Sequence, residues 1–112
     1  MAKLNVTAIA EDGLSAPGNA LVTHVVVSVE DASGSPVAGL AATNFRIGTE
    51  IVGAGGSTSS ISSISIGKLP GVYLLKIIPL TGQTWKAGVY IHSIAVNHVA
   101  DKGQTLFSFL MD

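Results

Sequence analysis

Three apolar runs of strand length fill the last third of the chain, and each follows a glycine. The runs begin after Gly71, Gly88 and Gly103 and contain the segments LLKIIP, IHSIAVN and TLFSFLM. β-Branched and aromatic residues favour strands, and glycine or polar turn residues separate each run from the next. No stretch of useful length shows the 3.6-residue spacing of a helix. The pattern therefore predicts the final three strands of an all-β sandwich.

The first half of the chain also shows the two-residue alternation of half-buried strands. Leu4, Val6 and Ala8 alternate with polar residues, and the segment from Leu21 to Glu30 is the strongest strand candidate of this half. In that segment the valines share a face with Thr23, so His24 belongs to the opposite face. Applied to the whole chain, this alternation predicts a core made of Val25, Val27, Val29, Tyr73, Leu75, Ile77, Tyr90, Ile94 and Val96.

Three segments are predicted to connect the strands. Residues 31–36, DASGSP, combine an aspartate that can bond its own backbone, a glycine and a proline, which predicts a hairpin turn. Residues 97–103 are expected to form the last hairpin loop. Between them, the Gly/Ser/Thr-rich tract from Gly53 to Ser63 is interpreted as a mobile loop or a weak edge strand.

The size and composition of the chain favour one domain without disulfides. Its 112 residues leave no room for a second domain beside a seven-stranded sandwich of about 100 residues, so a single domain over residues 1–112 is expected. The absence of cysteine excludes disulfides and thiolate ligands. The N-terminal MAKLNVT lacks a signal-peptide core, and no apolar stretch approaches the ~18 residues that cross a membrane.

The low charge of the chain argues against nucleic-acid binding and favours a protein partner. Charged residues make up 12% of the sequence, with six basic residues against seven acidic ones. Typical globular proteins contain roughly 25% charged residues, and the basic residues here are scattered singly. A domain this small exposes much of its chain, so some apolar surface is expected to remain for a partner or for self-association.

Two groups of residues carry a family resemblance. The pattern V-x-V-x-D-x-x-G-x-P-V-x-G-L over residues 27–40, followed by Asn44-Phe45, resembles the opening strands of bacterial immunoglobulin-like modules of the invasin and macroglobulin kind. The segments beginning at Gly71 and Gly88, G-x-Y-x-L and G-x-Y, are similar to the closing strands of filamin-type repeats.

The resemblance implies an immunoglobulin-like sandwich of about seven antiparallel strands. It also implies a noncatalytic role in adhesion, assembly or protein contact, in a cell-surface or secreted setting and usually within a tandem array. The chain lacks the paired acidic motifs with which cadherin-like modules hold calcium, so no cofactor is expected. A transthyretin-like sandwich, which differs in connectivity, is the structural alternative.

The sequence offers few residues for catalysis or ligand binding. His92 shares the parity of the inward-facing Tyr90, His24 has outward parity, and His98 lies some 20 Å along the strand from His92, so no metal site or catalytic centre is predicted. Trp85 supports an alternative function, a small-ligand or carbohydrate-binding module that uses this side chain and the nearby loops. The opposing interpretation is that Trp85 closes one end of the sandwich.

The last strand predicts how the domain assembles. Residues 105–111 are apolar on both faces, so a monomer would expose one face or cover it, for example with the tract from Gly53 to Ser63. We therefore expect a homo-oligomer, with an interface near Leu106, Phe107, Ser108, Phe109 and Leu110.

Overall fold

The computed structural model describes residues 3–12, 23–51, 59–66, 69–79 and 84–111. Within these residues the chain forms seven strands and one short 3₁₀ helix, η1, at Ala42–Asn44. The strands are β1 (Asn5–Ala10), β2 (Thr23–Glu30), β3 (Phe45–Ile51), β4 (Ser59–Ile66), β5 (Val72–Pro79), β6 (Gly88–His98) and β7 (Asp101–Met111).

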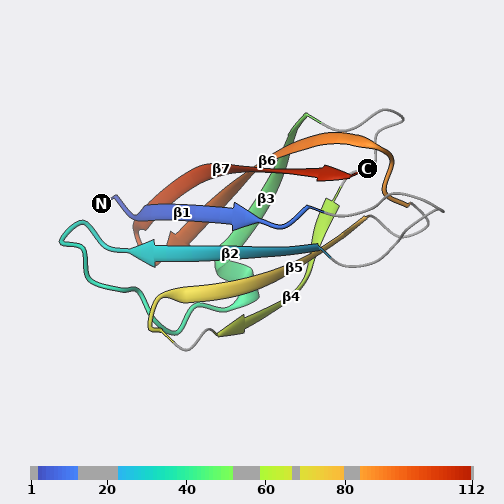
Figure 1. Ribbon diagram of the computed structural model, residues 1–112. Coiled ribbons are helices and arrows are strands. Elements are labelled where there is room, and N and C mark those ends of the chain that lie inside the picture. The colour runs from blue at the N-terminus through green and yellow to red at the C-terminus, as the bar shows by residue number, and fades with distance from the viewer. Residues whose placement is uncertain (1–2, 13–22, 52–58, 67–68, 80–83, 112) are drawn as a thin grey trace.

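The strands build two antiparallel sheets that pack as a sandwich (Figure 1). One sheet has the order β1-β2-β5-β4 and the other has the order β3-β6-β7. These orders are those of the seven-stranded, constant-type immunoglobulin sandwich, with sheets ABED and CFG. The predicted fold class is therefore confirmed, and the connectivity is immunoglobulin-like.

The core between the sheets consists of the residues that the alternation predicted. All nine predicted core side chains are at most 1% exposed. The alternation determines the core because successive side chains of a strand point to opposite faces, and β2 and β5 follow it from end to end. Further buried apolar residues come from the segment before β1, the connections, β3 and β7: Leu4, Val37, Leu40, Phe45, Trp85, Phe107, Phe109 and Met111.

The predicted hairpin turn after β2 is present, but the strand pairing that it produces is short. It forms a hairpin only through the bridge between Glu30 and Pro36 and the hydrogen bond from Val37 N–H to the Val29 carbonyl, 3.0 Å. The next full strand, β3, lies in the opposite sheet. The chain therefore crosses the sandwich here, and β2 pairs with β1 and β5 instead.

Asp31 organises this turn through one carboxylate oxygen. Its Oδ1 accepts hydrogen bonds from Ser33 Oγ (2.7 Å), Ser33 N–H (2.9 Å) and Ser35 N–H (3.0 Å). The Ser33 hydroxyl first, and then the Ser35 backbone N–H, stabilise the charged form and lower the pKa of Asp31 below its ordinary value. The sequence correctly identified this residue as the organiser of the turn.

This lowered pKa predicts an acid-dependent contribution of Asp31 to stability. A depressed pKa stabilises the fold above the unfolded-state value of about 3.9, and the contribution disappears as the pH falls through the folded-state pKa. We therefore expect Asp31→Ala to be less stable than the wild type at neutral pH, with the difference shrinking as the solution is acidified below the ordinary aspartate pKa. Urea unfolding of both proteins across a pH series measures this difference in stability. A difference that stays constant at acidic pH would contradict this role.

The last two strands are joined more tightly than predicted. Strands β6 and β7 stay paired up to His98 and Asp101, so only Val99 and Ala100 form the turn instead of the expected loop over residues 97–103. Val99 adopts a φ of 56°, which is rare for a β-branched residue. Nothing in the local sequence identifies a turn there, because Val99-Ala100 lacks the glycine or asparagine that usually occupies such a position.

The Gly/Ser/Thr-rich tract is partly a strand. Residues 59–63 belong to β4, the edge strand of the four-stranded sheet, which confirms the edge-strand interpretation for that part. Residues 53–58 lie outside the described part of the chain. The described part of the tract pairs with β5 and therefore belongs to the sheet that does not contain β7.

Candidate interaction surfaces

Trp85 belongs to the core and closes one end of it. The side chain is 1% exposed and meets Tyr90 and Phe109 edge-on, with ring centroids 5.3 Å and 5.4 Å away. Stacking on a sugar would require an open face of the indole, and this arrangement leaves none. Trp85 was the ligand contact of the alternative function only; the structure places the side chain at one end of the core, as the opposing interpretation expected.

Tyr90 fixes the turn that brings Trp85 into the core. Its hydroxyl donates to the Lys86 carbonyl (2.7 Å) and accepts from the Lys86 N–H (2.9 Å). A tyrosine near the start of the sixth strand that bonds a backbone group a few residues upstream is the tyrosine corner of immunoglobulin-like domains. The sequence showed Tyr90 as a core residue but did not show this contact.

His92 points into the core and His24 points outward, as their parity predicted. His92 is fully buried among Tyr90, Phe107 and Phe109, and its Nδ1 lies 3.2 Å from the Gly48 carbonyl oxygen. His24 lies on the outer face of β2, and His98 ends β6. The described residues contain no group of three or more side chains that could hold a metal ion.

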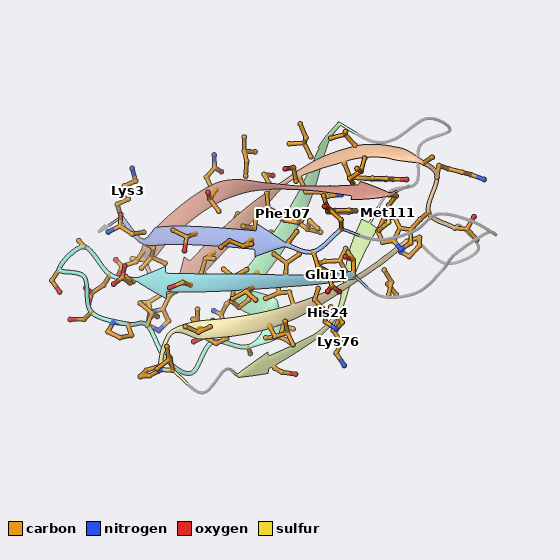
Figure 2. All side chains as sticks on the ribbon, viewed as in Figure 1. Lys3, Glu11, His24, Lys76, Phe107 and Met111 are labelled. Carbon is orange, nitrogen blue, oxygen red and sulfur yellow. The ribbon has the colours of Figure 1, made fainter. Side chains whose placement is uncertain are left out.

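His24 joins Glu11 on the outer face of the four-stranded sheet, next to Lys76 (Figure 2). The His24 Nδ1 and N–H both contact Glu11 Oε1, and the two backbones are linked by the hydrogen bond from Glu11 N–H to the His24 carbonyl, 3.0 Å. Thr23 Oγ1 donates to the Glu11 carbonyl at 2.9 Å. These contacts hold the chain against β2 where it leaves β1.

A shallow apolar hollow lies beside this pair. It has a volume of about 450 Å³, and most of its apolar lining comes from one cross-strand row, Ile9 of β1, Val26 of β2 and Leu74 of β5, with Ala10 beside it. Ile9 and Val26 are exposed and point away from the core. The hollow is open and apolar, with Glu11 and His24 at its rim, so it lacks converging polar groups that could fix the orientation of a ligand.

The outer face of the three-stranded sheet carries a second group of exposed apolar side chains. Leu106 is 60% exposed, Leu110 is 41% exposed, and Val89, which lies directly opposite Leu110 across the β6–β7 pair, is 51% exposed. Ile91, half-buried, lies opposite Ser108 between them. We call Val89, Ile91, Leu106 and Leu110 the leucine patch.

The structure divides the predicted interface residues between the two faces of β7. Phe107 and Phe109 are buried in the core, because they pair with the inward-facing His92 and Tyr90. Their inclusion in a surface interface was therefore wrong. Leu106, Ser108 and Leu110 point outward and are exposed. The last strand is apolar on both sides, but only its leucines reach the surface.

A second hollow lies on this same outer face, at the end where β6 turns into β7. It has a volume of about 380 Å³ and is lined by Lys3, Ala95, Asn97, Lys102, Gly103 and Gln104. Lys3 reaches it because the chain before β1 runs alongside β7: Lys3 bridges Lys102 in parallel, and Leu4 N–H donates to the Lys102 carbonyl at 2.8 Å.

Gly103 makes this close approach feasible. A Cβ at this position would lie 2.9 Å from Leu4 Cβ and closer still to the Leu4 carbonyl oxygen. Glycine in a strand often marks a site where another backbone comes near. The sequence showed Gly103 only as the start of an apolar run, because the contact with Leu4 spans almost the whole length of the chain.

The fold and these surfaces define the class of the protein, an immunoglobulin-like β-sandwich with two exposed sheet faces. Neither a protein-family model nor a curated protein matches the chain. Among the described residues, no helix is long and apolar enough to cross a membrane.

Proposed function

We propose that this domain is a noncatalytic structural or protein-interaction module that associates with a second copy of itself. The observation that carries the proposal is the leucine patch, whose members Val89, Leu106 and Leu110 all point away from the core on the outer face of the β3-β6-β7 sheet. The proposal agrees with the resemblance of residues 27–45 to bacterial immunoglobulin-like modules.

The geometry of the leucine patch supports a twofold contact. Val89 and Leu110 are directly opposite each other, and Leu106 lies four residues before Leu110, about 13 Å along β7. Two such faces can stack about 10 Å apart with their side chains interdigitated, as the sheets of a sandwich do. In a twofold dimer the same patch is buried on both copies, so one apolar surface suffices.

The charge around the leucine patch limits how partners can approach. Arg46 and Lys102 lie on the same outer face, exposed, toward the end where β6 turns into β7. Like charges that face each other across an interface are unfavourable. An antiparallel arrangement of two copies places the basic end of each sheet beyond the leucine patch of the other, which keeps the cations apart.

The test is to place charge in the leucine patch and measure the mass of the particle. We expect the wild type to elute as a multiple of its 11.4 kDa chain mass in size exclusion with light scattering, and Leu106→Lys/Leu110→Lys to be monomeric. Leu69→Lys is the matched control, because Leu69 is 68% exposed but lies in the turn before β5. Surface substitutions usually change folding stability by no more than about 0.5 kcal/mol, so all variants should fold.

Two results would contradict the proposal. A wild-type mass of 11.4 kDa across a wide concentration range would exclude self-association. An oligomer that persists in the double lysine variant would place the interface elsewhere on the domain.

A further inference from the structure

We infer that the hollow between Lys3 and Lys102 binds a small hydroxylated carboxylate, of which an acidic sugar is the representative. The two lysines belong to segments from opposite ends of the chain, and they become neighbours only because the segment before β1 is hydrogen-bonded to β7. Figure 2 shows Lys3 at the end of the molecule opposite Glu11 and His24. This inference concerns other residues than the leucine patch and does not depend on self-association.

The charge of the hollow selects an anion. Lys3 and Lys102 contribute two ammonium groups, and Arg46 lies on the same face, across β6 from Gln104, in the row Arg46, Ala95, Gln104. Three of the six basic residues of a sparsely charged chain thus gather at one place.

The amides of the hollow select a ligand that also carries hydroxyl groups. Asn97 lies opposite Lys102 and Gln104 opposite Ala95 on the same outer face. Lysine only donates hydrogen bonds, whereas a carboxamide both donates and accepts, so these two side chains can bind hydroxyls that an inorganic anion does not offer. Within the described residues, the hydrogen bond of Asn97 uses its backbone carbonyl, which leaves its carboxamide available.

The shape of the hollow fits a ligand of one sugar ring. Its volume of about 380 Å³ falls in the range of roughly 300 to 1,000 Å³ that small-molecule sites occupy. Gly103 and Ala95 form a floor with little side chain, so a ring can approach the sheet between the two lysines. No aromatic residue lines the hollow among the described residues, and binding is therefore expected to depend on charge and hydrogen bonds.

The experiment is a titration of the ¹⁵N-labelled protein with sodium glucuronate at low ionic strength, followed by NMR. Saturable shifts are expected for the side-chain amides of Asn97 and Gln104 and for the backbone around Lys102. Glucose, which has the hydroxyls without the charge, and sulfate, which has the charge without the hydroxyls, are the matched probes and should both bind more weakly. Removing a charge-assisted contact of about 1.5 kcal/mol or more corresponds to about tenfold in Kd, so Lys3→Gln and Lys102→Gln should each weaken binding by at least this factor.

Lys76→Gln is the control, because Lys76 belongs to β5 in the other sheet. This substitution should leave glucuronate binding unchanged. Equal shifts with sulfate and glucuronate at equal concentration would overturn the preference for a hydroxylated ligand. Shifts confined to other residues, or unaffected by Lys3→Gln and Lys102→Gln, would overturn the site.

Discussion

Tyr73→Ala is expected to lower the free energy of unfolding by about 3 to 5 kcal/mol, as truncation of a buried aromatic residue does. The ring is almost fully buried and meets Phe45 edge-on at 5.3 Å. Its hydroxyl donates to the Val37 carbonyl at 2.6 Å and accepts from the Leu40 N–H at 3.1 Å. Tyr73 therefore holds the segment that crosses from one sheet to the other.

Tyr73→Phe separates the contribution of the ring to stability from that of the hydroxyl. It keeps the packing but leaves the Leu40 N–H and the Val37 carbonyl without their partner, and an unsatisfied buried group costs about 1 to 3 kcal/mol. Urea unfolding followed by circular dichroism measures both variants. Leu69→Ala is the control, because that side chain is 68% exposed and lies in the turn before β5, away from the leucine patch. A loss below about 1 kcal/mol for Tyr73→Ala would mean that the ring is not a core residue.

The two-residue alternation predicted most of the fold because it encodes which face of a strand is buried. In β2 and β5 a few polar residues, Ser28, Glu30 and Lys76, mark the outward face, and every core residue assigned from them and from β6 is buried. In β7 both faces are apolar, so the alternation could not separate Phe107 and Phe109 from Leu106 and Leu110. Only the register with β6 determines which face of β7 is buried, because Phe107 pairs with His92 and Phe109 with Tyr90.

The contacts that form the surfaces could not be predicted, because they join residues that are distant in sequence. The Lys3–Lys102 hollow depends on a bridge between the two ends of the chain, and the Glu11–His24 pair on the path of the chain out of β1. Trp85 precedes β6 and belongs to no alternating run, so nothing local showed whether it lies in the core. The positions of these residues can be assigned only once the strand topology is known.

Trp85→Ala is expected to destabilise the domain by about 3 to 5 kcal/mol, since it removes the largest side chain of the core and leaves a cavity. The loss includes the edge contacts with Tyr90 and Phe109, which contribute about 0.5 to 1.5 kcal/mol per pair beyond the buried area. Trp85→Phe keeps an aromatic ring and should lose less. Because Trp85 is the only tryptophan, circular dichroism is the suitable probe of unfolding.

The fluorescence of the wild type tests the same placement without a substitution. An indole that is 1% exposed should be quenched by iodide only after unfolding, because the ion cannot reach it in the native state. Neutral glycans should likewise leave the emission unchanged, since Trp85 offers them no open face. If iodide quenched the native protein and the Trp85→Ala variant were as stable as the wild type, Trp85 would have to lie at the surface and not in the core. A saturable response to neutral glycans would then support the carbohydrate-binding alternative.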